Sequence, residues 1–322
     1  MGRPRPGQPG RRSTLIGVPI DCVGAPRPGD APFGTELAPA ALRQAGLARA
    51  IGADDAGDLP VRLVGRARDA ETGVVGWPSV RLVTSAVRAR VGDLVAAGDL
   101  PFLAGGCCTL LPGALAGARD ALAPASPAAT GPVAAGPAPI GLAYLDGHLD
   151  LYDGHTSPTG EPADMPISVV TGHGPAAWSA DVGAPVADPA RLALLGPRDR
   201  GEAVAGGSVM PENAGLEAEL SPAALRARGL AEAGRAAARQ LSGGAGRYWV
   251  HLDVDVLDEH IFPATDYLMP GGLTLDELHD LIGPLLAGPG LAGVSLGCYN
   301  PDKDPARSGA ATLVSLLGAV LG

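Results

Sequence analysis

The sequence predicts an α/β fold, a single doubly wound domain of about eight mostly parallel strands with helices on both faces. Short apolar runs that suit buried strands alternate along the chain with longer segments of helical periodicity. Strands separated by helices require right-handed crossovers, which place helices on both faces of a mostly parallel sheet. Two acidic clusters also follow two of the apolar runs, at the edge of the sheet where such folds bind ligands.

Each element follows from its local pattern. The predicted strands are short, apolar and in part β-branched or aromatic, and they cover residues 14–20, 61–64, 101–104, 142–145, 167–171, 192–195, 248–252 and 293–296. The predicted helices cover residues 39–51, 80–97, 110–122, 222–241, 274–286 and 310–320. A chain of 322 residues that is 46% hydrophobic can bury the core of one large domain or two small ones, and we favour one.

Two segments differ in composition from this domain. Residues 1–13 are rich in arginine and are followed by no apolar stretch of the signal-peptide kind, so we expect a disordered basic tail. The single domain then covers residues 14–322. Residues 123–139 consist almost wholly of Ala, Pro, Gly, Ser and Thr and predict a low-complexity surface loop within it.

The charge of the chain excludes some partners. A net charge of −10, with no Lys/Arg-rich run in the body of the chain, provides no electrostatic surface for nucleic acid or an anionic membrane. No segment reaches the run of about eighteen apolar residues that a transmembrane helix needs. Four cysteines, two of them adjacent, do not form the disulfide framework of a secreted protein. We therefore expect a cytoplasmic protein with a small-molecule substrate.

The two acidic clusters predict a metal site. Asp146, His148 and Asp150 follow strand 142–145, and Asp253 and Asp255 follow strand 248–252. If the strand geometry continues, alternate residues share a face, so each cluster would present its side chains together. Five such groups in one crevice would repel one another without a cation, and carboxylates that can bridge favour two ions over one. A helix cap or Asx-turn is the alternative for either cluster alone, but a cap needs one acid rather than a row.

Nine short segments match one set of family motifs in order and spacing. They are residues 16–19, 24–29, 34–43, 146–150 (D-G-H-L-D), 253–258 (D-V-D-V-L-D), 263–265, 270–274 (P-G-G-L-T), 300–301 and 304–305. Together they resemble the ureohydrolase superfamily, which comprises arginases, agmatinases and formimidoylglutamases, over most of the chain. The resemblance implies an arginase-like doubly wound sheet, manganese as the usual metal and a homo-oligomer.

The resemblance also implies roles for the acids. Asp146 and Asp253 would bridge two divalent ions, Asp150 would join the first ion, and His148 with Asp255 the second. The ions make a shared water acidic, and hydroxide attacks the trigonal carbon of a guanidinium or amidine, which expels an amine and leaves urea or an analogue. Asp150 is the catalytic candidate that accepts and hands on the proton of the water.

Glu277 falls where arginases place a carboxylate that holds the guanidinium, and it is assigned to catalysis and substrate binding. The alternative is an exposed glutamate at a helix start, which the helix dipole stabilises.

One departure from the family pattern concerns a metal ligand. Where the family motif G-G-D-H-S supplies a histidine ligand, this chain has Cys108. Thiolate is a soft ligand that suits zinc better than manganese, so Zn²⁺ is a second possibility beside Mn²⁺. The alternatives are that Cys107 and Cys108 are inert core residues of an inactive enzyme, or that they form a vicinal disulfide.

A second departure lies in the loop after Asp150. The positions with which arginases hold the head group of an amino acid carry Tyr152, Thr159 and Glu161, and Ala163 replaces the proton-shuttle histidine. We therefore expect L-arginine to be a poor substrate. His155 could reach the site from this loop, although a surface position is favoured. Thr265 is assigned to substrate binding, and the chain also departs from the pattern at Tyr267 and Cys298.

Two functions from different classes remain. A cysteine in place of the histidine ligand, together with D-G-H-x-D, is also a feature of one branch of the family, the hydroxyarginine-cleaving enzyme of cycloserine biosynthesis. This chain resembles that branch. That similarity favours a binuclear-metal hydrolase of a substituted guanidine, such as N-hydroxy-arginine, in specialised metabolism. The alternative is a non-catalytic relative with a degraded metal site that acts as a binding or scaffold protein. Retention of all five Asp and His ligands favours the enzyme, since only a metal neutralises these acids.

Overall fold

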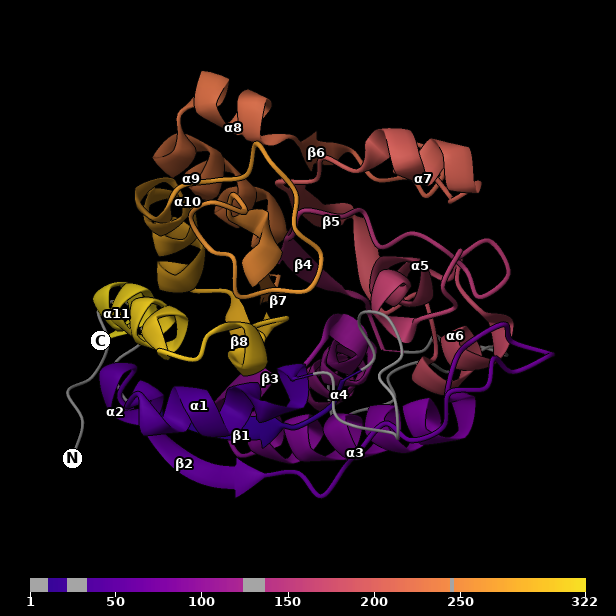
Figure 1. Ribbon diagram of the computed structural model, residues 1–322, viewed down its shortest axis with the longest axis horizontal. Helices are drawn as coiled ribbons and strands as arrows, with labels where there is room; N and C mark the ends of the chain where they lie inside the picture. Colours follow the sequence, from indigo (N-terminus) through magenta and orange to yellow (C-terminus); the bar gives the residue numbers. More distant parts are fainter. Residues whose placement is uncertain (1–10, 22–33, 124–136, 244–245) are drawn as a thin grey trace, which may run out of the picture.

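One eight-stranded sheet forms the centre of the protein (Figure 1). The computed structural model describes residues 11–21, 34–123, 137–243 and 246–322. The strands are β1 Ser13–Val18, β2 Ala53–Asp58, β3 Leu100–Gly105, β4 Ile140–Leu145, β5 Ala187–Leu195, β6 Ala218–Leu220, β7 Tyr248–Asp253 and β8 Leu291–Gly297. Their order across the sheet is β2-β1-β3-β8-β7-β4-β5-β6, and every neighbouring pair is parallel. The predicted fold class is confirmed.

Helices cover the sheet in two groups. The described helices are α1 Ala38–Gln44, α2 Leu47–Ala50, α3 Trp77–Ala96, α4 Leu111–Leu122, α5 Pro166–Thr171, α6 Ala176–Val182, α7 Arg200–Gly206, α8 Pro222–Arg228, α9 Leu230–Leu241, α10 Leu275–Ala287 and α11 Ser308–Leu321. Helices α1, α2, α11, α10 and α9 contact one another in sequence, and α3, α4, α5 and α6 form the other group. Among the described residues, five short 3₁₀ helices lie between these elements: η2 Thr35–Leu37, η3 Cys108–Leu110, η4 Pro162–Asp164, η6 Val254–Val256 and η7 Pro301–Lys303.

Burial explains which strands could be recognised. Every residue of β3, β4, β7 and β8 is buried, as in a parallel sheet that is covered on both faces. Such strands need apolar side chains throughout, which is the pattern the sequence carries. These central strands hold the loops at their carboxyl ends in fixed positions.

Two predicted strands are wrong. Residues 61–64 lie outside any strand, and the edge strand is β2, whose sequence A-D-D-A-G-D is largely exposed and therefore lacks an apolar pattern. Residues 167–171 belong to helix α5, which is buried and begins with a proline at its first turn. A short apolar run fits a buried helix as well as a buried strand. Strand β6 and helices α6 and α7 were not predicted.

Two predicted helices are each divided in two. The segment 39–51 is interrupted at Gly46, and the segment 222–241 at Gly229. Both glycines have a positive φ, 92° and 84°, which other residues rarely adopt and which ends a helix.

The two segments of unusual composition fall largely outside the described residues. Residues 1–10 of the basic tail and 124–136 of the low-complexity segment are not described. At the described end of the tail, Arg12 forms an ion pair with Asp99, and Ser13 begins β1. A single domain over 14–322 stays a prediction. Across the described ranges, none of the helices has the length and apolar character of a membrane span.

Candidate active site

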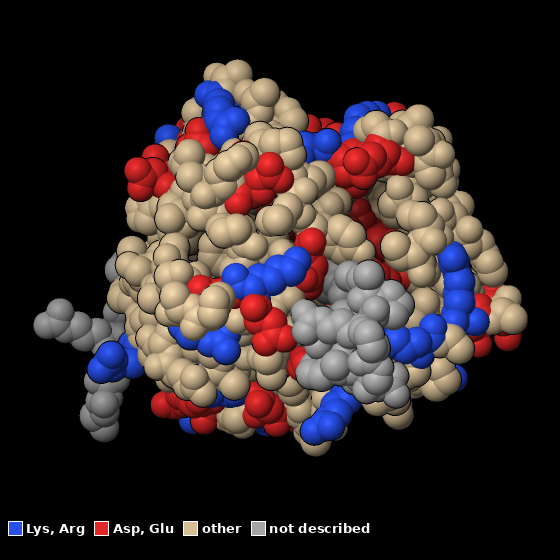
Figure 2. Space-filling view, viewed as in Figure 1, with Lys and Arg blue, Asp and Glu red and all other residues tan. Residues whose placement is uncertain are grey.

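A cavity of about 150 Å³ lies at the carboxyl edge of the sheet. The loops that follow β3, β4, β5, β7 and β8 all contribute to its walls. Nine of its eighteen lining residues are Asp or Glu, and none of the described lining residues is Lys or Arg. Figure 2 shows acidic side chains at a hollow in this face of the molecule. The cavity is therefore suited to cations.

The structure brings nearly all of the predicted site residues to this cavity. The predicted metal ligands that line it are Cys108, Asp146, His148, Asp150, Asp253 and Asp255. The predicted substrate-binding residues that line it are Tyr152, Thr159, Glu161 and Thr265. Ala163, Tyr267 and Cys298, which depart from the family pattern, line it as well.

The possible ligand atoms form two clusters that share Asp146. We call Cys108, Asp146, His251 and Asp253 the first cluster; their ligand atoms lie within 4.8 Å of one another. Asp146, His148 and Asp255 form the second cluster by the same measure. Asp146 lies in both clusters, and its role as a bridge between two ions stays a prediction. Asp253 belongs only to the first cluster.

Turns rather than a continued strand bring these ligands together. Strand β4 ends at Leu145, and Asp150 has a positive φ of 50°, so strand geometry does not continue through residues 146–150. Asp146 Oδ1 accepts a hydrogen bond from the backbone N–H of His148 at 2.6 Å. Asp253 Oδ1 accepts one from the N–H of Asp255 at 2.8 Å. Both acids therefore also make the local turn contacts that were the alternative for each cluster.

The second cluster is tied together by its histidine. His148 Nδ1 lies 3.0 Å from Asp255 Oδ2 and 3.4 Å from Asp146 Oδ1. Burial opposes the protonation of His148, but the charge of Asp255 and contacts with both acids raise its pKa well above the ordinary value. His148 therefore lies between the two acids of the second cluster and contacts both of them.

Burial raises the pKa of three carboxyl groups of the site. It raises the pKa of Asp146 to about 7, with the charge of Asp255 as the next cause. Burial and neighbouring acids also raise the pKa of Asp150 and Asp253 well above the ordinary value. Carboxylates that are desolvated and face one another are stabilised by a cation. The donor chemistry of both clusters therefore fits divalent metal ions.

Asp150 lies in neither cluster. Its Oδ2 accepts a short hydrogen bond from the hydroxyl of Tyr144, and its backbone carbonyl accepts from the N–H of Ile167 at 3.1 Å. Its carboxyl group faces the cavity with a raised pKa, so it is suited to hold a proton. Its role as a metal ligand stays a prediction.

His251 was missed by sequence reasoning. It lies on β7, is fully buried, and its Nε2 lies 3.2 Å from Cys108 Sγ. Burial lowers the pKa of His251 to about 3, so the imidazole is neutral. The signal was present, because residues 251–255 align with the motif S-x-D-x-D of the ureohydrolases that this chain resembles, with His251 in place of the serine and on the same strand face as Asp253.

The cysteines of the site are free thiols. Cys108 and Cys298 line the cavity with their Sγ atoms 3.6 Å apart, and Cys108 Sγ lies 2.8 Å from Asp253 Oδ2. Cys107 Sγ lies instead 3.2 Å from Thr109 Oγ1. Cys107 and Cys108 are not bonded to each other, so the vicinal disulfide is wrong.

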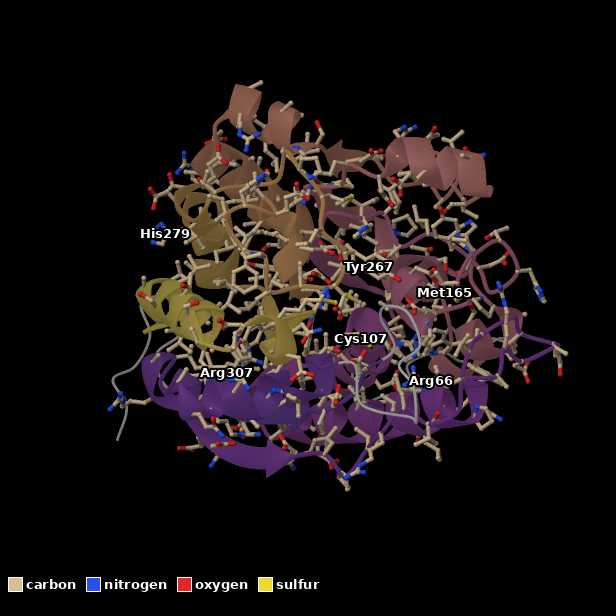
Figure 3. The ribbon with its side chains drawn as sticks, in the orientation of Figure 1. Arg66, Cys107, Met165, Tyr267, His279 and Arg307 are labelled. Carbon is tan, nitrogen blue, oxygen red and sulfur yellow. The ribbon has the colours of Figure 1, made fainter. Side chains whose placement is uncertain are left out.

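Polar residues form the mouth of the cavity. The Tyr267 hydroxyl donates to Glu161 Oε2 at 2.9 Å, and its ring meets the edge of His148 at 5.9 Å between centroids. Thr159 Oγ1 donates to Asp164 Oδ2 at 3.1 Å, and burial raises the pKa of Asp164 to about 6. Figure 3 shows Tyr267 near the centre of the view, whereas His279 lies at the periphery.

His155 does not reach the cavity wall. It is exposed, and its Nε2 lies 3.0 Å from the backbone carbonyl oxygen of Glu71. It is not among the described residues that line the cavity. The surface position that the sequence favoured is confirmed.

The predicted role of Glu277 is corrected. It is not among the described residues of the cavity wall. Its backbone N–H donates to Thr274 Oγ1 at 3.2 Å, and its Oε2 accepts from the N–H of Thr274 at 2.9 Å, so the two form a capping box at the start of α10. Glu277 Oε1 also pairs with Arg226 at 2.6 Å. The helix-start alternative is the right one.

We expect Glu277→Gln to leave catalysis almost unchanged and to weaken the fold. Kinetic constants for a guanidine should stay within about threefold, because Glu277 does not reach the substrate. The unfolding free energy should fall by up to about 1 kcal/mol, because the partly exposed ion pair with Arg226 is lost, whereas Gln can still accept from the N–H of Thr274 in the capping box. Arg226→Met should give a similar loss of stability. A fall in kcat/KM of about 10²-fold at unchanged stability would contradict this placement.

Comparison with known proteins identifies the family of the chain. A parallel α/β sheet with carboxylate clusters at its carboxyl edge is the architecture of a class of metal-dependent hydrolases. The model of the Arginase family matches residues 11–322, so the chain belongs to the arginase family. It is 27% identical to the arginase of Agrobacterium fabrum, over 96% of this chain and 90% of that protein.

Solved structures share the fold at low identity. The arginase from Bacillus caldovelox superposes with a TM-score of 0.81 at 23% identity, over 97% of this chain and 98% of that chain. Proclavaminate amidino hydrolase from Streptomyces clavuligerus superposes with a TM-score of 0.65 at 17% identity, over 99% and 93%. The predicted superfamily is confirmed.

Proposed function

We propose that this protein hydrolyses a C–N bond of a cationic guanidine or amidine and releases urea, or a substituted urea, and an amine. The observation that carries the proposal is the pair of ligand clusters that share Asp146 in an acidic cavity. Membership in the arginase family supports it. Two divalent ions, when bound, lower the pKa of water and so supply a nucleophile at neutral pH.

The residues of the chain have distinct roles in this reaction. The oxygen of water forms a bond to the guanidine carbon, and the bond from that carbon to the leaving nitrogen breaks. Asp150 accepts the proton of the water and passes it to the departing amine. The Tyr144 hydroxyl fixes the carboxyl group of Asp150. The acids of the cavity attract the cationic substrate.

We propose a substituted guanidine of specialised metabolism as the substrate. Tyr152, Thr159, Glu161 and Thr265 would contact it, since all four line the cavity. No proton-shuttle histidine is present at Ala163, so a leaving group that needs little protonation is favoured. The proclavaminate enzyme, a relative by fold, is named for an amidino substrate that differs from arginine.

Manganese is the metal we propose, with zinc as the alternative at the first cluster. The second cluster offers two carboxylates and an imidazole, which suit Mn²⁺. The first cluster includes the thiol of Cys108, which as a thiolate suits Zn²⁺.

We expect Cys108→His to raise the manganese content of the protein. Imidazole is a harder ligand than thiolate, so the first cluster should lose its preference for zinc. Both metals should be measured after dialysis against equal concentrations of Mn²⁺ and Zn²⁺. Cys107→Ser is the matched control, because Cys107 is buried next to Cys108 but is not among the described residues that line the cavity. Equal manganese content in the wild type and Cys108→His would show that Cys108 is not a ligand.

Metal loading followed by an assay of urea release tests the proposal. Protein that has been stripped with a chelator should bind two equivalents of Mn²⁺ and then release urea or hydroxyurea from one or more substituted guanidines. Release should stop when the chelator returns. A folded protein that binds no divalent ion and cleaves no guanidine would support the alternative, a non-catalytic scaffold of the arginase fold.

A further inference from the structure

We propose that His251 is a ligand of the metal ion at the first cluster, through Nε2 and together with Cys108. The inference rests on the proposed function only in requiring that a divalent ion binds there. The family motif places one histidine where this chain has Cys108, and a serine where it has His251. Both positions therefore differ from the family pattern, and the imidazole comes from strand β7, which is separated from β3 by β8.

The contacts of the ligand atoms point to this site. His251 Nε2 lies 3.2 Å from Cys108 Sγ, and Cys108 Sγ lies 2.8 Å from Asp253 Oδ2. All the ligand atoms of the first cluster lie within 4.8 Å of one another, and the residues that carry them are buried. Atoms that bind one ion at 2.0 to about 2.3 Å must lie within about this separation of one another. The arrangement therefore needs little rearrangement to accept an ion.

A hydrogen-bonded neighbour aims the imidazole at the cluster. His251 Nδ1 lies 2.7 Å from Ser295 Oγ, and the indole N–H of Trp249 donates to the same oxygen at 2.9 Å. A serine oxygen has two lone pairs, so it can accept from Trp249 and from Nδ1–H of His251 together. The lone pair of Nε2 then points to Cys108. Metal-binding histidines are commonly held in this way, with the second ring nitrogen donating to a fixed acceptor.

Ring stacking fixes the plane of the imidazole. The rings of Tyr144 and His251 stack at 5.1 Å between centroids with an interplanar angle of 10°. The hydroxyl of the same Tyr144 donates to Asp150. One tyrosine therefore orients both His251 and the carboxyl group proposed to transfer the proton.

The donor set gives the two clusters different chemistry. The first cluster offers one thiolate, one imidazole and two carboxylates, four donors that match the tetrahedral coordination of Zn²⁺ or Co²⁺. The second cluster offers no sulfur. We therefore expect the first equivalent of a zinc-like ion to bind at Cys108 and His251.

A role for His251 in holding the thiolate is the competing explanation. In that case Nε2–H donates to Cys108 Sγ, and the imidazole is a positioning residue with no bond to the ion. Loss of such a partner weakens metal binding by about 10- to 100-fold. Loss of a ligand removes one donor from the ion itself, so its coordination number and its spectrum change.

Cobalt binding to His251 variants separates the two roles. Metal-free wild type, His251→Ala and His251→Gln should be titrated with Co²⁺, with stoichiometry from elemental analysis and visible absorption spectra at each step. Gln can still donate to the thiolate but is a poor ligand. His279→Ala is the control, because His279 is exposed and belongs to neither ligand cluster; Figure 3 shows it at the edge of the view. Circular dichroism of each metal-free variant confirms that it is folded.

We expect both variants to bind the first equivalent of Co²⁺ at least about 10³-fold more weakly than wild type, beyond the range for a lost hydrogen-bonding partner. Their ligand-field bands should shift, and free imidazole should restore the band of wild type in His251→Ala. His251→Gln with the stoichiometry, affinity and spectrum of wild type would overturn the assignment. Wild type that binds two ions but cleaves no guanidine would overturn the proposed function and leave this assignment standing.

Discussion

Asp146→Asn should abolish both metal binding and hydrolysis. Asp146 is the residue that the two ligand clusters share, so its loss removes a donor from both ions. An amide oxygen carries no full negative charge and cannot offset two divalent cations. We expect kcat/KM to fall by at least about 10³-fold, which corresponds to about 4 kcal/mol of transition-state stabilisation. Metal content after dialysis should fall from two equivalents to less than one.

The control for this variant is an acid away from the cavity. Asp280→Asn changes the charge equally on the exposed surface of α10, where its side chain is 62% accessible. It should keep both ions and full activity. Asp146→Asn with two tightly bound ions and activity near that of wild type would contradict the two-metal proposal.

Thermal stability of the metal-free protein gives a second measurement of the same variant. In the folded protein the pKa of Asp146 is raised from 3.8 to about 7, so between these pH values the folded state binds more protons than the unfolded state. Stability of the metal-free protein should therefore fall as pH rises from about 4 to about 7. Asp146→Asn should reduce this fall and be more stable than metal-free wild type at pH 8. If Asp146 only stabilised the fold, Asp146→Asn would be less stable than metal-free wild type at pH 8.

The sequence predicted the sheet where burial dictates the side chains. Strands such as β4 and β7 are covered on both faces, so their apolar runs were recognisable. The edge strand β2 is exposed on all but its first residue, and its pairing with β1 uses only backbone groups, which no side-chain pattern reports. The short helix α5 is as apolar as a strand, so its pattern could not separate the two.

The site shows a similar division. Motif spacing located the ligands that follow β4 and β7, because the sheet holds the residues at the carboxyl ends of its neighbouring strands close together. The same spacing misplaced Glu277, because its side chain pairs with Arg226, 51 residues earlier in the chain, and caps helix α10 together with Thr274. It also missed His251, whose proximity to Cys108 depends on strands β3 and β7 meeting β8 from opposite sides. The histidine at position 251 can be read from the sequence, but its contact with Cys108 is visible only in three dimensions.

The charge of the cavity mouth predicts which end groups a substrate can carry. Glu161, Asp164 and Glu202 line the cavity, and Lys and Arg are absent from its described wall. One carboxylate oxygen of Asp164 is buried without a hydrogen-bond partner. A substrate carboxylate near these groups is repelled by on the order of 1 kcal/mol for each close pair. An amine end group is attracted instead.

Four guanidines separate the effect of the end group on kcat/KM from the effect of N-hydroxylation. L-arginine and N-hydroxy-arginine carry a carboxylate, and their decarboxylated counterparts carry only the amine. We expect N-hydroxylation to raise kcat/KM at least about tenfold, equal to about 1.4 kcal/mol, because the electron-withdrawing hydroxyl activates the guanidine carbon and so compensates for the missing proton-shuttle histidine at Ala163. Decarboxylation should raise kcat/KM by a further factor of about ten, mainly through a lower KM.

Glu161→Gln and Glu202→Gln test the origin of that preference. Each removes one negative charge from the cavity mouth and contributes no atom to the ligand clusters. Each variant should lower the ratio of kcat/KM for the decarboxylated substrate to kcat/KM for its carboxylate partner. Added salt should lower this ratio less than either substitution does, because charges inside the cavity are screened poorly. L-arginine as the best of the four substrates would refute both the expected role of the Ala163 replacement and the role assigned to the acids of the mouth.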